Sequence, residues 1–174
     1  VNQADILICV CPPHAAGDVA QSVVRHGYRG VYVDANAISP ARSRSIADTV
    51  QAVGAQFVDG SIVGPPAWEP GTTRLYLSGG QSRTVAECFT DSPLQAVVLD
   101  GPLTAASALK MVYAAYTKGT TALVSAPPRP LLWARREEEA VICIRKDHRG
   151  RITALSDGSL ACHRPLSRDD RSAD

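Results

Sequence analysis

Apolar runs that are typical of buried strands alternate with amphipathic helical patterns, and this alternation restricts the fold more than any other feature of the chain. Residues 5–11 (DILICVC) form an almost unbroken apolar run after a polar start, as in strands that are buried on both faces of a parallel sheet. Residues 15–26 follow with a short amphipathic pattern that ends at Gly27. Strands separated by helices favour an α/β fold with a doubly wound, parallel sheet.

The alternation continues to residue 124. Ser39 and Pro40 are the residue types of a helix N-cap followed by a first-turn proline, and Gly54 is expected to end that helix. The other predicted strands are residues 30–36, 55–64, 72–80 and 94–101. The other predicted helices are residues 81–90 and 104–124. After residue 124 the chain becomes polar and arginine-rich, and only residues 140–146 (AVICIRK) keep a strand pattern, which predicts one isolated strand in a poorly ordered tail over residues 125–174.

The charge balance and the cysteines exclude several classes of protein. Lys and Arg number 18 against 17 Asp and Glu, so no global field for nucleic acid or for an acidic membrane surface is expected. No apolar run approaches the roughly 20 residues of a membrane-spanning helix. Five scattered cysteines do not form a secreted disulfide framework, which favours a cytoplasmic protein with reduced thiols. Cys9 and Cys11 share one face of a predicted strand, where we expect them to lie too far apart for a relaxed disulfide.

Four segments carry a family pattern in their order and spacing. They are residues 9–20 (CVCPPHAAGDVA), 33–40 (VDANAISP), 57–67 (FVDGSIVGPPA) with 73–80 (TRLYLSGG), and 105–123 (AASALKMVYAAYTKGTTAL). Together they resemble the β-hydroxyacid dehydrogenase superfamily, which includes the 6-phosphogluconate and 3-hydroxyisobutyrate dehydrogenases, and most of all its phosphogluconate dehydrogenase C-terminal-like branch.

The resemblance implies the second half of a Rossmann-like, NAD(P)-binding, doubly wound sheet over residues 1–103. Residues 104–124 then correspond to the first long helix of an all-helical domain, and residues 125–174 to an irregular tail. Residues 5–11 correspond to the fourth strand of the sheet, so the resemblance implies an N-terminally incomplete chain whose first strand is an unpaired, aggregation-prone edge. The glycine-rich G-x-G-x-x-G turn that holds the pyrophosphate does not occur in the sequence, and we therefore expect this chain alone to bind NAD(P)H weakly or not at all.

The resemblance implies that Lys110 is the catalytic lysine, because it stands at the lysine of the K-x-x-x-N helix motif of the family. The asparagine of that motif is replaced here by Ala114, and Tyr113 and Thr117 share the helix face of Lys110 as candidate substrate-binding replacements. The alternative is an ordinary surface lysine whose stem lies on apolar surface.

The resemblance also assigns residues at the ends of the predicted strands. Cys11, Pro12, His14 and Ala37 correspond to nicotinamide-binding positions, although His14 is equally well explained as the cap of a helix. Asn36, at the next strand end, keeps donor and acceptor groups for a substrate.

The second substrate loop of the family corresponds to Ser61 and Gly64. Its serine–glycine–glycine stretch is altered here, since Val63 and Pro65 flank Gly64, so the substrate is expected to differ from 3-hydroxyisobutyrate and 6-phosphogluconate. Asp34 and Asp59 are expected to cap local backbone rather than to catalyse. The thiols and imidazoles at positions 143, 148, 162 and 163 lack the spacing of a zinc site, so no metal is predicted.

Two functions of different classes remain open. The first is an NAD- or NADP-dependent oxidoreductase that transfers a hydride between the cofactor and a small hydroxy-acid-like substrate, with a homodimer implied for the complete protein. The alternative is a truncated, non-catalytic remnant that at most binds a partner, which the change of composition after residue 124 favours. The residue that distinguishes NAD from NADP belongs to the half of the domain that the sequence does not show.

Overall fold

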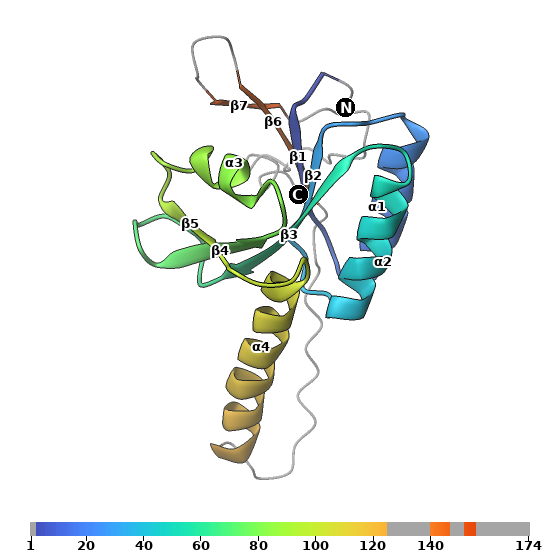
Figure 1. Ribbon diagram of the computed structural model, residues 1–174. Helices are drawn as coiled ribbons and strands as arrows, with labels where there is room; N and C mark the ends of the chain where they lie inside the picture. The colour runs from blue at the N-terminus through green and yellow to red at the C-terminus, as the bar shows by residue number, and fades with distance from the viewer. Residues whose placement is uncertain (1–2, 125–139, 147–151, 156–174) are drawn as a thin grey trace, which may run out of the picture.

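A single mixed sheet with helices on both faces organises the computed structural model, which describes residues 3–124, 140–146 and 152–155 (Figure 1). The strand order is β5-β4-β3-β2-β1-β6-β7. The Rossmann-like α/β fold that the sequence predicts is confirmed, with differences in strand direction at both sides of the sheet.

The first three strands form the parallel centre of the sheet. These strands are β1 (Ile6–Val10), β2 (Val31–Asp34) and β3 (Gln56–Val63). Helices α1 (Ala16–Arg25) and α2 (Pro40–Gln51) make the crossovers between them, as the predicted alternation requires. The Ser39 side chain accepts a hydrogen bond from the Arg42 backbone N–H and so caps α2 as predicted.

The strand that follows β3 runs antiparallel to it. β4 (Thr73–Ser78) is joined to β3 by a proline-containing loop with no helix, and such a short connection returns the chain beside the strand it has just left. Helix α3 (Ser82–Glu87) then crosses over to β5 (Leu94–Val98), which is parallel to β4. The expected all-parallel sheet therefore becomes a mixed one after residue 63.

Two apolar clusters pack on opposite faces of the sheet. One lies under α1 and α2 and includes Leu7, Tyr32 and Phe57, all less than one-tenth exposed. The other lies under α3 and includes Ile8, Val58 and Val85. Alternate residues of β1 and β3 thus enter different cores. This explains why the apolar run of residues 5–11 is unbroken, as predicted for a strand that is buried on both faces.

The free edge expected at the first strand is not present. β6 (Ala140–Lys146) pairs antiparallel with β1 over its whole length, and β7 (Ile152–Leu155) pairs with β6. The prediction of an unpaired β1 edge is therefore wrong, because a strand from the far end of the chain takes its hydrogen-bonding groups. The expected isolated strand at residues 140–146 is instead the middle of a three-stranded antiparallel arrangement.

Helix α4 (Ala105–Val124) begins against β3 and β4 and then extends away from the sheet (Figure 1). Its start agrees with the predicted helix to within one residue. Among the described residues, no helix is both long enough and apolar enough to cross a membrane.

Candidate functional site

The carboxyl ends of β1, β2 and β3 lie at the same edge of the sheet, because the three strands are parallel and adjacent. The predicted cofactor and substrate residues follow these ends: Cys11, Pro12 and His14 after β1, Asn36 and Ala37 after β2, and Gly64 after β3. Ser61 is in the last part of β3, and Lys110 approaches that part of β3 from α4.

Asn36 ties the ends of β1 and β2 together. Its side-chain oxygen accepts a hydrogen bond from the Cys11 backbone N–H at 2.5 Å, and its amide nitrogen donates to the Cys9 sulfur at 3.4 Å. The residue is 3% exposed. Both ends of the side chain that the sequence offers to a substrate are thus used within the protein, which indicates that Asn36 positions the strand ends.

The loop after β1 is held against α2 and presents part of its surface to solvent. The Arg42 guanidinium donates to the His14 carbonyl oxygen at 2.8 Å. His14 and Ala37 are exposed, whereas Pro12 is buried. A ligand at this edge of the sheet would therefore meet the two exposed residues directly.

Cys9 and Cys11 are closer than the strand pattern predicts. Their sulfur atoms are 3.6 Å apart, although no disulfide joins them. β1 ends at Val10, so Cys11 is outside the regular strand and the full strand spacing between the two residues does not apply. The two sulfurs are therefore in contact, while the expected absence of a disulfide between them stays a prediction.

Lys110 reaches the carboxyl end of β3. Its ammonium nitrogen donates to the Ile62 carbonyl oxygen at 2.5 Å. Partial burial lowers the pKa of Lys110, and the positive charge of Lys118 lowers it further. Lys110 is therefore not an ordinary solvated surface lysine. Its partial burial and lowered pKa suit proton transfer by a lysine.

Ser61 is a buried hydroxyl on the α4 side of β3. Ser61 shares a strand face with Asp59, two residues before it, and Asp59 bonds to α4. The Ser61 hydroxyl has no hydrogen-bond partner in the described structure. An unpaired buried hydroxyl is costly, so the Ser61 oxygen is a candidate hydrogen-bond partner for a bound ligand.

A buried carboxylate anchors the first turn of α4. Asp59 accepts hydrogen bonds from the Ser43 hydroxyl at 2.8 Å and from both the backbone N–H and the hydroxyl of Ser107 at 2.6 Å. Burial raises the pKa of Asp59, and these hydrogen bonds oppose the rise. The Ser78 hydroxyl adds a second bridge, because it donates to the Leu103 carbonyl oxygen and accepts from the Ala106 N–H.

Asp34 lies opposite Asp59 in the register of β2 and β3. One of its oxygens accepts from the Asn36 backbone N–H at 3.0 Å, as expected of a residue that caps local backbone, and the other has no partner among the described residues. Burial raises the pKa of Asp34 to about 6, and the negative charge of Asp59 contributes to the rise.

The anchoring serines were missed by the sequence analysis. Ser107 precedes Lys110 by one helical turn, so its position on the same helix face was the available signal. Ser43 and Ser78 come from α2 and β4, and no local pattern connects them with Asp59 or with α4.

Tyr113 and Thr117 are not brought together with the strand ends by any described contact, and Gly64 has a structural role at the end of β3. Tyr113 is 45% exposed on α4, and the Thr117 hydroxyl donates to the Tyr113 carbonyl oxygen of its own helix at 2.9 Å. Gly64 has a φ of 132°, and a side chain there would lie 2.5 Å from the Thr72 carbonyl oxygen. Gly64 is thus required by the turn itself.

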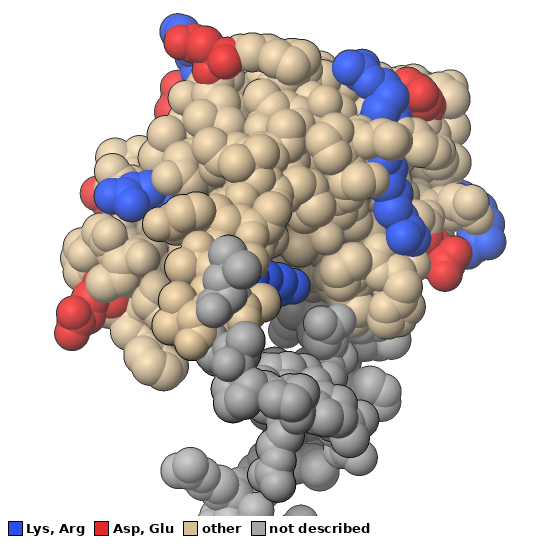
Figure 2. Space-filling view, turned by 90° about the horizontal axis from the view of Figure 1, so that it is seen from below, with Lys and Arg blue, Asp and Glu red and all other residues tan. Residues whose placement is uncertain are grey.

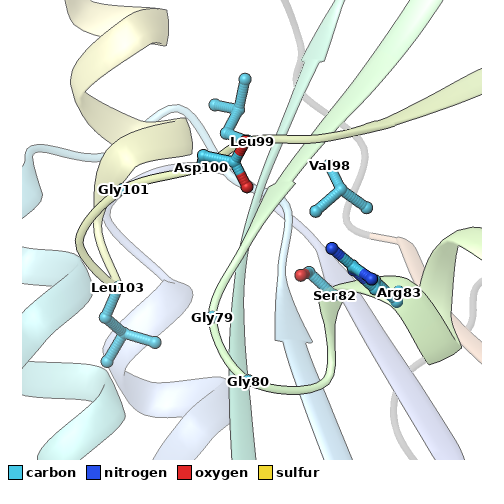
Figure 3. Close-up of a pocket in the computed structure, with 9 residues that line it drawn as sticks. All are labelled: Gly79, Gly80, Ser82, Arg83, Val98, Leu99, Asp100, Gly101 and Leu103. Carbon is cyan, nitrogen blue, oxygen red and sulfur yellow. The ribbon is translucent and has the colours of Figure 1, made fainter.

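A hollow lies away from these residues. It has a volume of about 440 Å³ and is formed where β4 and β5 end, with Gly79, Gly80, Arg83 and Asp100 among its lining residues (Figure 3). None of the predicted site residues lines it.

Viewed from the α4 end, Lys and Arg side chains are dispersed over the visible surface rather than gathered in one patch (Figure 2). Within the part of the chain that the structure describes, no three His, Cys, Asp or Glu residues form a metal-binding group, and residues 148, 162 and 163 lie outside that part.

Comparison with known proteins gives matches among solved structures. Neither the protein-family models nor the curated proteins contain a match. The structure is similar to the conserved protein MTH1747, described as structurally similar to 3-hydroxyacid dehydrogenases, with a TM-score of 0.57 and 32% sequence identity over 67% of this chain and 44% of that protein.

Two imine reductase structures from Myxococcus stipitatus are also similar. The enzyme in complex with NADP+ has a TM-score of 0.59, with 19% identity over 71% of this chain and 45% of the enzyme. A variant in complex with NAD+ has a TM-score of 0.55, with 21% identity over 69% of this chain and 44% of the variant. The chain spans less than half the length of each of these three proteins. The described chain therefore shares the fold of the 3-hydroxyacid dehydrogenase-like oxidoreductases, the superfamily that its sequence resembles.

Proposed function

We propose that this chain is part of an NAD(P)-dependent oxidoreductase that transfers a hydride between the nicotinamide and a small hydroxy-acid-like substrate. The observation that carries the proposal is the partly buried Lys110 amine, whose pKa is lowered, at the same strand end as the unpaired Ser61 hydroxyl. A proton-transferring amine and a hydroxyl without a partner are the groups that oxidation of an alcohol beside a carboxylate would use.

The strand ends fit one side of a nicotinamide site. The exposed His14 and Ala37 follow adjacent parallel strands, and Arg42 holds the loop after β1 in place. Cys11 and Pro12 would shape the floor of that site. When bound, the nicotinamide supplies the hydride acceptor or donor. Structural neighbours in complex with NAD+ and with NADP+ support both cofactors as candidates.

The residues of the chain have separate roles in this proposal. Lys110 accepts the hydroxyl proton of the substrate in the oxidation direction and returns it in the reduction direction. Ser61 donates a hydrogen bond to the substrate, and the backbone at Gly64 shapes the adjoining turn. Tyr113 and Thr117 would reach the same substrate from α4, with Thr117 first giving up its bond to the helix backbone. Asn36 acts by holding the ends of β1 and β2 in register.

The second function, a non-catalytic remnant, is favoured by the change of composition after residue 124, and two further features of the sequence agree with it. No G-x-G-x-x-G turn occurs in the chain, and Ala114 stands where the family motif has asparagine. The imine reductases among the neighbours give imines as a further substrate class for the oxidoreductase. A panel of imines alongside hydroxy acids would test it.

Lys110→Met tests the lysine in a form of the protein that carries a glycine-rich turn. Turnover is expected to fall by about 100-fold or more, with NAD(P)H affinity within a few-fold of wild type, because methionine keeps the length of the side chain without a titratable proton. Lys118→Arg, which keeps the positive charge near Lys110, is the control on the exposed part of the same helix. Equal turnover in Lys110→Met and Lys118→Arg would remove Lys110 from the reaction.

A further inference from the structure

Cys9 and Cys11 form a close thiol pair with two different environments. Their sulfurs are 3.6 Å apart and are not joined by a disulfide. Cys9 is fully buried in the core beneath α1 and α2, whereas Cys11 is partly exposed just beyond the end of β1. The proposed function uses neither sulfur as a reacting atom.

We propose that Cys9 and Cys11 are a hydroperoxide-sensitive dithiol that closes to a reversible disulfide at the carboxyl end of β1. The two sulfurs need to approach by less than 2 Å to reach a bonding distance of about 2 Å. Cys11 lies one residue beyond the end of β1, whereas Cys9 is inside the strand and pairs with Asp34 of β2. The movement required therefore falls mainly on the loop that follows β1.

The different exposure of the two thiols assigns their roles. The Cys11 thiolate attacks hydrogen peroxide, so that an S–O bond forms, the O–O bond breaks and hydroxide leaves, which oxidises Cys11 to the sulfenic acid. The Cys9 thiolate then attacks the Cys11 sulfur, so that the S–S bond forms, the S–O bond breaks and the oxygen leaves as water after taking a proton. In sum, two thiols lose two electrons and two protons, and one peroxide is reduced to two waters.

The surroundings of Cys9 favour its role as the resolving thiol. The hydrogen bond with Cys11 lowers the pKa of Cys9, while its burial acts in the opposite direction. The Asn36 amide also donates to the Cys9 sulfur at 3.4 Å. Burial keeps Cys9 from direct attack by peroxide, but its sulfur already faces Cys11 at van der Waals distance.

Asn36 connects the thiol pair to the strand ends. Its oxygen accepts from the Cys11 backbone N–H and its nitrogen donates to the Cys9 sulfur, so it contacts both partners of the proposed disulfide. Closure of the disulfide moves the Cys11 backbone and disturbs this two-ended contact. Oxidation is therefore expected to change the conformation of the β1–α1 loop as well as the thiol count.

Peptide mapping after mild peroxide treatment tests the proposal in the wild-type chain. Trypsin cleavage after Arg25 gives a peptide of residues 1–25 that contains Cys9 and Cys11 and no other cysteine. We expect this peptide to lose the mass of two hydrogens, to resist alkylation, and to recover both thiols after treatment with dithiothreitol. Separate sulfinic acids on the two cysteines, a disulfide to another peptide or unmodified thiols would each overturn the proposal.

Single-cysteine variants separate the two roles. In Cys9→Ser, the Cys11 sulfenic acid should persist and react with dimedone, whereas in Cys11→Ser the peptide of residues 1–25 should lose no hydrogens and form no dimedone adduct. Cys88→Ser, which alters a cysteine in the other core, should leave the intramolecular disulfide unchanged. Rapid dimedone labelling of Cys9 in Cys11→Ser would contradict the assignment of Cys11 as the attacking thiol.

Discussion

The two ends of α4 have opposite environments although one continuous helical pattern encodes both. At the start of the helix, Ala106 and Ser107 are fully buried and the Asp59 and Ser78 side chains bind the first turn. Further along, Val112 and Tyr116 are each 71% exposed and Val124 is 82% exposed. Buried polar contacts therefore hold the first turns of α4 against the sheet, and the later turns are exposed.

The comparison shows that helix formation and helix burial are separate properties. The first turn of α4 is tied to three other elements, α2, β3 and β4, through Ser43, Asp59 and Ser78. The later turns present large apolar side chains to solvent, which is typical of a helix face that meets a partner. The homodimer implied by the family resemblance would supply such a partner, and that assembly remains a proposal.

The largest predicted effect is at the anchored end. Asp59→Ala removes the acceptor for the Ser43 hydroxyl and for two groups of Ser107, all buried. The free energy of unfolding should fall by about 3 to 5 kcal/mol, because several buried donors lose their partner. Denaturant unfolding followed by circular dichroism measures this change.

Asp48→Ala is the matched control for Asp59→Ala, since Asp48 is exposed on α2. Its effect should stay within about 0.5 kcal/mol. A loss at Asp59 no larger than the loss at Asp48 would show that the Asp59 contacts do not hold α4 in solution.

A second prediction concerns the pH dependence of the same buried layer. Burial raises the pKa of Asp34 from 3.8 to about 6, so the folded state binds the Asp34 proton more tightly than the unfolded state. The stabilising contribution is complete below the unfolded pKa and is lost as the pH rises through about 6. The two pKa values correspond to about 3 kcal/mol as an order of magnitude.

Asp34→Asn isolates this contribution. The slope of unfolding free energy against pH between 4 and 6 should become smaller, by the share that Asp34 contributes, while the double variant Asp34→Asn with Asp59→Asn should show a smaller slope still. The remaining slope in Asp34→Asn is expected to come partly from Asp59, whose pKa is also raised by burial. An unchanged slope in Asp34→Asn would mean that Asp34 is solvated in the native state.

Much of the fold follows from the sequence because its signals are local. The apolar run at β1, the Ser39 cap before Pro40 and the alanine-rich α4 each depend on neighbouring residues, and the structure confirms them. The antiparallel direction of β4 depends on the short, helix-free loop between β3 and β4, and the prediction of an all-parallel sheet did not take that loop into account. The pairing of β6 with β1 joins residues more than 120 positions apart, and no local pattern reports such a contact.

The candidate site divides in the same way. The positions of Cys11 and Asn36 after strand ends and of Lys110 on α4 follow from the element order together with the family resemblance. The bonds that Asn36 makes within the protein and the serine contacts of Asp59 join residues far apart in the chain, so the sequence could not supply them.

The smallest predicted effect is at the far end of α4, and it completes the comparison. Tyr116→Ala removes a side chain that is 71% exposed and places the best helix-forming residue in its position. The free energy of unfolding at low protein concentration should therefore change by no more than about 0.5 kcal/mol, since little apolar surface leaves water at this site. Denaturant unfolding at two protein concentrations measures the change and its origin. A loss above about 1 kcal/mol that grows with protein concentration would show that this face of α4 contacts a second copy of the chain. A loss of the same size at both concentrations would show instead that another part of the same chain covers this face of α4. Either result would mean that both ends of α4 are buried in solution.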